Sequence, residues 1–276
     1  MAVRTYYWHS RKVSRPRLLW HRLRGRNPAL YFLVGNSGDI ITRDIIRLKY
    51  GEDALNVSGE GRRLLLVGSI SPHMRPGDIV SGIGTKGEVP TRDQAPCRIF
   101  GLRGPITYDR FKAAGHDLSE VKFLKDPGLL IRFMVPNPDV KPEPGKVIFI
   151  PHYRERESYR KNLPNGIRFV DIDAEPTTIA RDILSAELVY SSSLHGVIFS
   201  HSLGRPCVLV APQTEEPELK YEDYFSSLNL TYTKPFASIF DAAKAPKPNS
   251  PADVKVTLEE FAFPSREILA EAGVLV

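Results

Sequence analysis

The chain has 276 residues, of which 42% are hydrophobic and 25% are charged, as is usual for a soluble globular protein that buries a core. This length allows one large domain or two of medium size. We expect neither a membrane span nor a signal peptide, because the sequence has no apolar run of the required length. Cys97 and Cys207 lie outside any metal-ligand spacing. We therefore predict no metal site and no disulfide framework, and a reducing cytoplasm as the compartment.

The net charge of +6 is concentrated at the N-terminus. Residues 1–38 contain eight Lys and Arg and no acidic residue, and the first carboxylate is Asp39. We predict a basic N-terminal arm over residues 1–28. It is either a solvated arm or a contact with an anionic phospholipid surface. No nucleic acid is expected as a partner, because the rest of the chain shows no zinc-finger spacing or basic recognition helix.

The first half of the chain repeats a strand followed by a glycine-bearing turn. The expected strands are 29–34, 63–70, 79–85 and 98–102. The first runs into Gly35–Asp39 and then into helical spacing over 40–48. This turn matches neither a dinucleotide fingerprint nor a phosphate-binding P-loop. It is either a ligand loop or a plain helix start capped by Asn36, Ser37 or Asp39.

Two charged residues stand where later strands of this half end. Arg103 precedes Gly104-Pro105 and a helix start, where a guanidinium can hold a phosphate or carboxylate; a surface ion pair is the other interpretation. Asp126 follows a short strand over 121–124. It either orients a cation such as Arg103 or caps the next helix.

A proline-rich stretch containing Pro136, Pro138, Pro142 and Pro144 is the expected linker. The strand–helix rhythm restarts after it, with strands over 146–150 and 167–172 and a helix over 177–185. The fold class is therefore predicted as α/β, with two Rossmann-like domains facing a cleft. They are a domain over residues 29–135 and a domain over residues 145–276 that ends in a C-terminal helix.

The stretch over residues 187–210 has the strongest chemical content. It reads as a buried strand, a turn of three serines, His195-Gly196, a short helix and another strand. Turns at the carboxyl ends of parallel strands expose helix N–H groups that favour anions. Hydroxyls and an imidazole in such a turn indicate a small anionic substrate. For a lone histidine, a structural role would be the alternative.

The motifs together resemble the polysaccharide pyruvyl transferase family over roughly residues 30–230. The matching segments are 35–39, 67–70, 81–85, 102–107, 126–128, 151–153, 191–196 and 220–224. The resemblance implies a GT-B-like fold, with an acceptor side in the first domain and a donor side in the second. It also implies transfer of pyruvate from phosphoenolpyruvate to two hydroxyls of one sugar, which forms a ketal. Phosphoenolpyruvate is then a substrate, and no cofactor is expected.

Residue roles follow from this resemblance and from the chemistry of the donor. Protonation of the donor methylene needs an acid, for which His195 is the first choice and His152 the second. The expected donor-binding residues are Arg103, Ser191, Ser192, Ser193, Gly196 and Lys220. The expected acceptor-binding residues are Asn36, Gly38, Asp39, Tyr221 and Asp223. His73 and His201 are expected to be structural.

The sequence departs from the family pattern at one position. Some members carry arginine two residues before the histidine, in a pattern like S-x-R-L-H-G, and here that residue is Ser193. If this arginine holds the donor phosphate, another cation must replace it, and Arg103, Arg205 and Lys220 are candidates.

Two other functions remain open at this stage. One is a nucleotide-sugar-dependent glycosyltransferase of the GT-B type, with residues 215–218 as the acidic group that would read the ribose. The other is a non-enzymatic carbohydrate- or lipid-binding protein. If the chain is the pyruvyl transferase, its saccharide acceptor is expected to be lipid-linked. The enzyme would then be cytoplasmic and peripheral at the inner face of the plasma membrane, held there by the basic arm.

Overall fold

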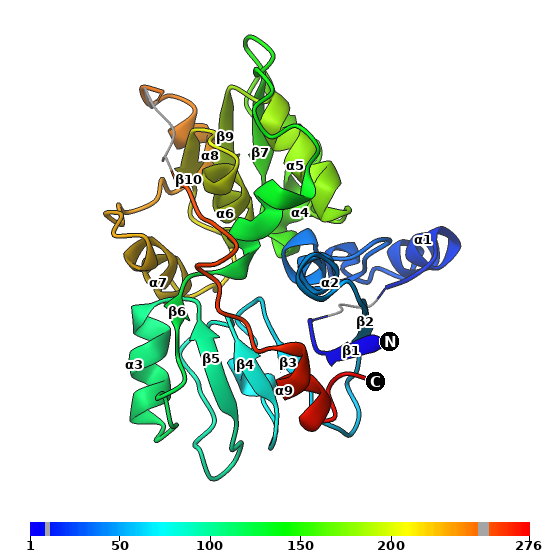
Figure 1. The fold of residues 1–276 in the computed structure, drawn as a ribbon. Coiled ribbons are helices and arrows are strands. Elements are labelled where there is room, and N and C mark those ends of the chain that lie inside the picture. The colour runs from blue at the N-terminus through cyan, green and yellow to red at the C-terminus, as the bar shows by residue number, and fades with distance from the viewer. Residues whose placement is uncertain (9–11, 248–253) are drawn as a thin grey trace.

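Two parallel β-sheets organise the chain, with helices between and around them (Figure 1). The computed structural model describes residues 1–8, 12–247 and 254–276. Among these residues, the first sheet has six strands in the order β2-β1-β3-β4-β5-β6. They are β1 Ala2–Thr5, β2 Asp53–Asn56, β3 Leu64–Leu65, β4 Ile79–Ser81, β5 Arg98–Leu102 and β6 Phe123–Leu124.

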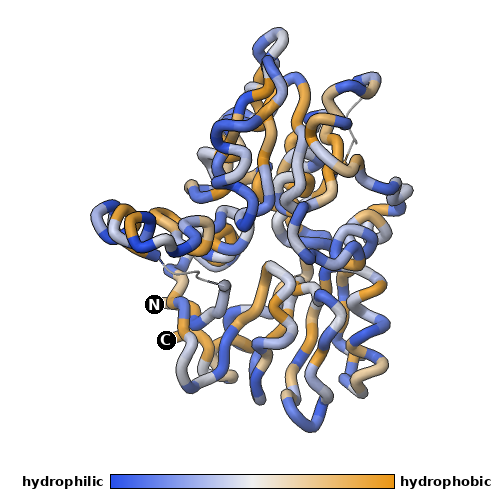
Figure 2. Tube along the Cα trace, turned by 180° about the vertical axis from the view of Figure 1, so that it is seen from behind, coloured by the Kyte–Doolittle hydropathy of each residue, from blue (hydrophilic) through white to orange (hydrophobic). Residues whose placement is uncertain are grey.

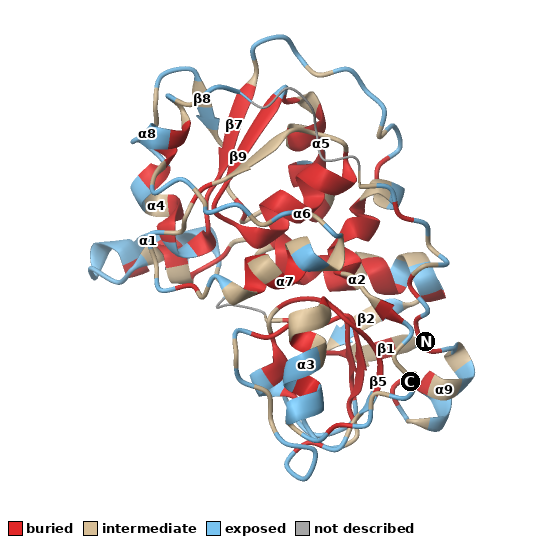
Figure 3. Cartoon of the chain, turned by 90° about the vertical axis from the view of Figure 1, so that its left-hand side faces the viewer, coloured by how far each residue is buried: buried red, intermediate tan, exposed pale blue. Residues whose placement is uncertain are grey.

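The second sheet, within the described part of the chain, has four strands in the order β10-β9-β7-β8. They are β7 Val147–Ile150, β8 Ile167–Phe169, β9 Leu188–Ser191 and β10 Cys207–Leu209. Apolar residues concentrate along the strands (Figure 2), and β7 and β9 are buried along their whole length (Figure 3). Burial on both faces is typical of parallel strands that helices cover on each side.

Helices pack between and around the two sheets (Figure 1). The helices are α1 Arg15–Leu23, α2 Ser37–Tyr50, α3 Pro105–Ala113, α4 Arg156–Tyr159, α5 Pro176–Ser185, α6 Leu194–Ser202, α7 Leu219–Ser227, α8 Ile239–Ala242 and α9 Arg266–Glu271. The 3-10 helices are η1 Pro28–Leu30, η2 Ser71–His73, η3 Pro127–Met134 and η4 Tyr153–Glu155. Both α2 and η3 pack against α5 and α6 and share one core with strands of both sheets. The packing therefore does not follow the predicted division at residues 135–145.

The strand predicted over residues 29–34 is wrong. Residues 28–30 form η1, where the Asn27 side chain accepts a hydrogen bond from Ala29 N at 3.0 Å. The next amides bind a carboxylate instead of a neighbouring strand. Asp173 accepts hydrogen bonds from the backbone N–H groups of residues 33, 34 and 35, at 2.9, 2.8 and 3.0 Å respectively. Apolar spacing alone does not reveal such a distant acceptor.

The predicted basic arm over residues 1–28 is also wrong at its start. Residues 2–5 form β1, which lies inside the first sheet between β2 and β3, and Val3 is fully buried. The alternating pattern of a four-residue strand is too short to stand out from a basic sequence. Residues 9–11 of the predicted arm, including Arg11, lie outside the described residues.

The C-terminal tail returns to the first sheet rather than to the second. Ala2 and Val276 exchange backbone hydrogen bonds of 2.6 and 2.8 Å, and Arg4 N donates to Val274 O at 2.8 Å. The Tyr50 hydroxyl donates to Pro264 O at 2.9 Å. The predicted helix near the C-terminus is present as α9, but it does not pack within a domain over residues 145–276.

In both sheets the strand order reverses next to one strand, which creates a topological switch point. In the first sheet β1 lies between β2 and β3, and in the second β7 lies between β8 and β9. Ligands of open α/β sheets bind at such switch points, outside the carboxyl ends of the strands. The α/β class with parallel, Rossmann-like sheets is confirmed, and the GT-B arrangement stays a prediction. No helix among the described residues is long and apolar enough to span a membrane.

Candidate active site

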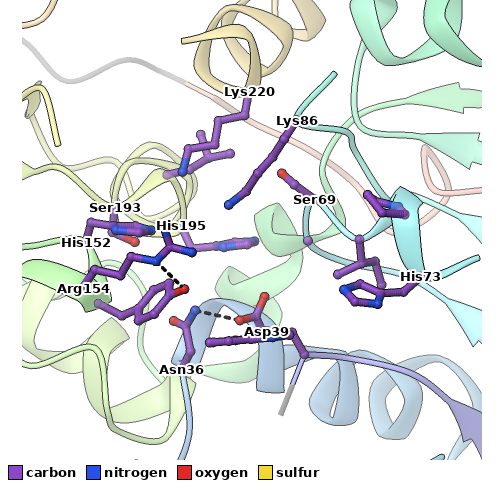
Figure 4. Close-up of a pocket in the computed structure, with 16 residues that line it drawn as sticks. Asn36, Asp39, Ser69, His73, Lys86, His152, Arg154, Ser193, His195 and Lys220 are labelled. Atoms are coloured by element: carbon purple, nitrogen blue, oxygen red, sulfur yellow. Dashed lines mark hydrogen bonds between the residues drawn. The ribbon is translucent and has the colours of Figure 1, made fainter. Parts of the chain in front are cut away.

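A cavity of about 300 Å³ lies between the carboxyl edges of the two sheets (Figure 4). The first sheet contributes Trp8 after β1, residues 68–70, 72 and 73 after β3, and Lys86 after β4. The second contributes residues 152–154 after β7 and residues 193–195 after β9. The cavity therefore lies at both switch points. Asn36 and Asp39 from α2 and Lys220 from α7 complete its wall.

His195 lies in the first turn of α6, on the cavity wall. A Cβ on Gly38 would come within 2.2 Å of its Nδ1, so only glycine lets α2 approach this ring. Its Nε2 is buried and has no hydrogen-bond partner among the described residues, and it lies 3.9 Å from Asp126 Oδ1. Asp126 caps η3 by accepting from Gly128 N at 2.8 Å, and its Oδ2 is likewise buried without a partner there. We call these two residues the His195–Asp126 pair.

Burial determines the protonation of this pair. It lowers the pKa of His195 to about 3, with smaller contributions from Arg103 and Lys220. It raises the pKa of Asp126 to about 6, against the attraction of Arg103. At neutral pH the imidazole is thus neutral beside a largely ionised carboxylate. This favours the tautomer with the proton on Nε2, which leaves Nδ1 as a proton acceptor.

Asp39 is the buried carboxyl of the cavity wall. It lies in the first turn of α2 and accepts a hydrogen bond of 2.7 Å from Asn36 Nδ2 (Figure 4). Burial raises its pKa to about 7, although Asn36, Lys86 and Lys220 all pull it down. A carboxyl that is about half protonated at neutral pH can both give and take a proton.

Four residues of the cavity wall, Lys86, His152, Arg154 and Lys220, surround the buried carboxylate of Glu216. Glu216, only 1% exposed in its side chain, lies 2.8 Å from Lys86 Nζ and 2.7 Å from Lys220 Nζ. His152 Nε2 and Arg154 Nη1 each lie 3.6 Å from Glu216 Oε1. We call these five residues the Glu216 cluster. It joins Lys86 of the first sheet's loops to His152 and Arg154 of the second sheet's loops.

The same cluster shifts the pKa of its members. Burial would raise the pKa of Glu216, but Lys220, His152 and Lys86 outweigh it and lower that pKa to about 2. Burial lowers the pKa of Lys220 to about 8, although Glu216 raises it. Burial and Lys220 lower the pKa of His152 to about 3. The cluster thus presents cations and a neutral imidazole around one ionised carboxylate.

Three of the predicted site residues lie beneath the cavity instead of on its wall. Arg103 is 1% exposed, and its Nε donates to Asp223 Oδ2 at 2.9 Å while its Nη1 donates to Ser69 Oγ at 2.7 Å. Asp223 also accepts from Thr107 N at 2.9 Å. The Tyr221 hydroxyl donates to the Ser192 carbonyl at 2.7 Å. Direct donor or acceptor contacts by Arg103, Asp223 and Tyr221 stay predictions, but the structure places them as buried supports.

The three serines of residues 191–193 also separate into residues beneath the cavity and a residue on its wall. Ser191 Oγ donates to the carbonyl oxygens of Ile150 and Ser193, each at 2.9 Å, and Ser192 Oγ donates to Glu155 at 2.7 Å. Only Ser193 of the three lines the cavity. A Cβ on Gly196 would come within 2.2 Å of Ser191 Oγ, so this glycine serves the packing of the turn.

The histidines and cations left open by the sequence fall into two groups. His152 lines the cavity, as expected, and so does His73, which was expected to be structural. His201 is buried beside the Tyr224 hydroxyl, 3.1 Å from its Nδ1, and does not line the cavity. Arg205 Nε donates to Leu184 O at 3.0 Å, away from the cavity. Of the candidate replacement cations, Lys220 is therefore the one that reaches the cavity.

Sequence reasoning missed Lys86, Arg154 and Trp8 as residues of the cavity wall. Lys86 and Arg154 follow strand ends, so the rule that identified His152 also points to them. Glu216 was expected only within the acidic group 215–218 that would read a ribose, and its pairing with Lys86 gave no signal because the two residues are 130 positions apart. The described residues contain no group of three or more His, Cys, Asp and Glu side chains placed to hold a metal ion.

Comparisons with known proteins support the motif analysis. Residues 95–214 match the model of a family described as polysaccharide pyruvyl transferase. A similar curated protein is the "Uncharacterized protein L143" of Acanthamoeba polyphaga mimivirus, which is 32% identical over 138 residues. That alignment covers 47% of each chain, so this chain matches about half the length of its relative. No solved structure matches.

The family match contains part of the cavity wall and leaves part outside. His152, Arg154 and residues 193–195 of the wall lie inside the matched range, as does the buried Asp126 beside His195, whereas α2, Lys86 and Lys220 lie outside it. The resemblance seen in the motifs is confirmed over this range. Residues 95–214 are accordingly identified as a polysaccharide pyruvyl transferase family domain.

Proposed function

We propose that the chain transfers pyruvate from phosphoenolpyruvate to two hydroxyls of one sugar in a lipid-linked exopolysaccharide repeat unit. The product is a pyruvate ketal, and the reaction belongs to the alkyl-transferring class. One observation carries the proposal. A single cavity combines the cations Lys86, Lys220 and Arg154 with a carboxyl of pKa about 7 and a neutral imidazole. The family match over residues 95–214 supports it.

The cations provide for the charge of the donor. Phosphoenolpyruvate carries a phosphate and a carboxylate. Lys86 reaches the cavity from the loop after β4, Lys220 from α7 and Arg154 from η4. The first turn of α6 adds the backbone N–H groups of Leu194 and His195, two residues that line the cavity. Lys220 and Lys86 thereby take the place of the arginine that some family members carry at the position of Ser193. The donor anion would take over these cations from Glu216.

Asp39 and His195 provide for the proton transfers. Protonated Asp39 gives its proton to the donor methylene, which becomes a methyl group and leaves the neighbouring carbon electron-poor. A sugar hydroxyl attacks that carbon, and His195 Nδ1 takes the hydroxyl proton. Phosphate then leaves with the proton that His195 holds, so that hydrogenphosphate is released and the imidazole is neutral again. The second hydroxyl attacks the same carbon, and its proton restores the acid form of Asp39. One phosphate is released for each ketal formed. The acid role thus moves from His195 to Asp39, because burial keeps the imidazole neutral.

The acceptor would lie on the side of the cavity formed by Trp8. The Trp8 ring packs against Phe32 and Tyr153, at centroid distances of 6.3 and 5.1 Å, and this contact fixes its orientation on the cavity wall. An aromatic face suits the apolar face of a sugar ring. Asn36 keeps the acceptor role expected from the sequence, since it also lines the cavity.

The test measures phosphate release with phosphoenolpyruvate and lipid-linked oligosaccharides, followed by mass spectrometry of the acceptor. We expect acceptor-dependent phosphate release and an acceptor heavier by one pyruvate less one water. Lys220→Met should weaken phosphoenolpyruvate binding about 10- to 100-fold in calorimetry. Lys112→Met on the exposed side of α3 is the matched control and should bind as the unmodified protein does.

A clear negative result is available from the same assay. Phosphoenolpyruvate that neither binds nor releases phosphate with any acceptor would reject the proposal. Release of a nucleoside diphosphate from a nucleotide sugar would favour the glycosyltransferase instead.

A further inference from the structure

The helix α1 presents an apolar stripe to solvent. Pro16, Leu19, Trp20 and Leu23 follow the spacing i, i+3, i+4, i+7, which places them on one side of a helix. Leu19 is 57%, Trp20 41% and Leu23 79% exposed. Exposed leucine and tryptophan that share one helical face indicate a surface that some partner covers. We call these four residues the α1 stripe.

Arginines border the α1 stripe on both sides. Arg15 and Arg22 lie along one edge, and Arg17 and Arg24, the C-cap residue, lie along the other. Arg24 and Arg26 also lie over the Trp20 ring, at 4.2 and 5.4 Å from its centroid. An apolar face between two rows of arginine is the pattern of a helix that lies in a membrane interface.

The opposite side of α1 is fastened to the rest of the protein. Leu18 and His21 are buried, and the His21 ring stacks on Tyr31 at a centroid distance of 4.0 Å. Arg22 Nη2 donates to Glu157 at 3.1 Å. The helix projects from the body (Figures 1 and 3), with its buried side inward and the α1 stripe outward.

The base of α1 adjoins the wall of the cavity. Val13 N donates to Phe32 O at 2.8 Å, and the Phe32 ring contacts Trp8, which lines the cavity. A surface bound by α1 would therefore be close to the cavity whichever substrate the cavity accepts.

We propose that α1 docks on an anionic phospholipid surface, with the α1 stripe inserted among the headgroups and the flanking arginines bound to lipid phosphates. This inference goes beyond the proposed reaction and does not rest on it. Charge complementarity selects the lipid surface over a second copy of the chain. A symmetric contact between two α1 helices would bring both rows of arginine against each other. The sequence predicted an electrostatic contact, and the structure adds the apolar side chains that insert.

The experiment measures co-sedimentation of the whole protein with phosphatidylglycerol–phosphatidylcholine vesicles and with pure phosphatidylcholine vesicles. We expect binding to the anionic vesicles only. The double variant Arg17→Gln/Arg24→Gln should bind about 30-fold more weakly. Leu19→Ser/Leu23→Ser should lose binding on the order of tenfold. Emission from Trp20, taken as the difference from Trp20→Phe, should shift to the blue when anionic vesicles are added.

Matched variants separate this contact from general effects of charge or hydrophobicity. Arg110→Gln/Lys112→Gln removes two exposed charges from α3, and Leu55→Ser removes an exposed leucine from β2. Both should bind vesicles as the unmodified protein does. Equal binding to phosphatidylcholine, unchanged binding of the α1 variants, or equal losses in the controls would overturn the proposal. So would light scattering that shows a dimer which Leu19→Ser/Leu23→Ser dissociates.

Discussion

Two groups of residues at the cavity differ in whether their buried polar atoms have partners. In the Glu216 cluster, a carboxylate lies within 2.8 Å of both Lys86 and Lys220. In the His195–Asp126 pair, Nε2 and Oδ2 are buried with no hydrogen bond to any described residue. Leaving such a group without a partner costs about 1–3 kcal/mol. One part of the wall is therefore electrostatically satisfied, and the other is not.

This difference separates two tasks of one site. Paired cations can exchange one anion for another, so the Glu216 cluster suits binding of a charged donor. The buried carboxyls Asp39 and Asp126 have pKa values near neutrality, and the buried His195 imidazole stays neutral with the Nδ1 lone pair as an acceptor, so these groups suit proton transfer. The three carboxyls illustrate the separation. The pKa is about 2 for Glu216, about 6 for Asp126 and about 7 for Asp39.

The largest effect is expected from Asp39→Asn. Losing the proposed acid should lower kcat about 10²- to 10⁴-fold and leave phosphoenolpyruvate affinity nearly unchanged. Single-turnover phosphate release and calorimetry measure the two quantities. Asp44→Asn, on the same helix but away from the cavity, is the matched control. Equal kcat in the two variants would remove Asp39 from the chemistry.

The effect of Asp39→Asn on the free energy of unfolding should depend on pH. The folded pKa of Asp39 is raised from 3.8 to about 7, so the carboxyl stabilises the fold below pH 4 and this contribution is lost as pH rises to 7. Asp39→Asn should therefore be more stable than the unmodified protein by about 1–4 kcal/mol at pH 8, and no more stable near pH 4. Urea unfolding at both pH values decides the matter, and a pH-independent difference would contradict the assignment.

Glu216→Gln tests the satisfied part of the wall. Removing this carboxylate leaves buried cations uncompensated, so the free energy of unfolding should fall by about 3 kcal/mol. Because the pKa of Glu216 is lowered to about 2, its contribution is present above pH 4.5 and is lost as pH falls toward 2. Phosphoenolpyruvate affinity should not fall, since the donor takes over the same cations. A loss of affinity would show that Glu216 is part of the donor site.

Gly38→Ala tests how closely α2 must approach His195. The added Cβ would lie 2.2 Å from His195 Nδ1, so the ring must move, and strain of about 1–3 kcal/mol is expected. We expect a clear loss of kcat, because the His195 ring is displaced, while the protein stays folded. Gly59→Ala, where a Cβ meets nothing within 4 Å, is the control. Full activity of Gly38→Ala would show that the ring position is unimportant.

Asp126→Asn should have the smallest effect. The amide keeps the cap on Gly128 N but no longer favours the Nε2-protonated tautomer of His195, so kcat should fall about tenfold. Nitrogen NMR of labelled histidine reports the tautomer directly. An unchanged tautomer together with reduced kcat would contradict this positioning role.

The end of β7 at residue 150 and the turn after β9 were predictable from the sequence, and so were the residues that follow them, whereas the predicted ends of β3, β4 and β8 lie three to five residues too far along the chain. His195, His152 and Ser193 line the cavity because parallel strands bring their carboxyl ends to one edge. Contacts between distant segments were not predictable. Arg103 follows a strand end as predicted, but its side chain binds Asp223, 120 residues away, and does not reach the cavity wall.

The errors in the fold have the same origin. The four residues of β1 gain their strand character from β2 and β3, and residues 33–35 bind Asp173 instead of a strand. Local spacing contains no record of these partners. It also did not separate the apolar stripe of α1 from a basic arm, because the arginines dominate the composition of residues 1–28.

The most direct test of the account is the reaction in D₂O with phosphoenolpyruvate and an acceptor, followed by mass spectrometry and proton NMR of the product. Because the donor methylene is protonated from the site, we expect one deuterium in the methyl group of each new ketal, with one phosphate released. A ketal methyl group without deuterium, or transfer that proceeds only from a nucleotide sugar, would contradict it.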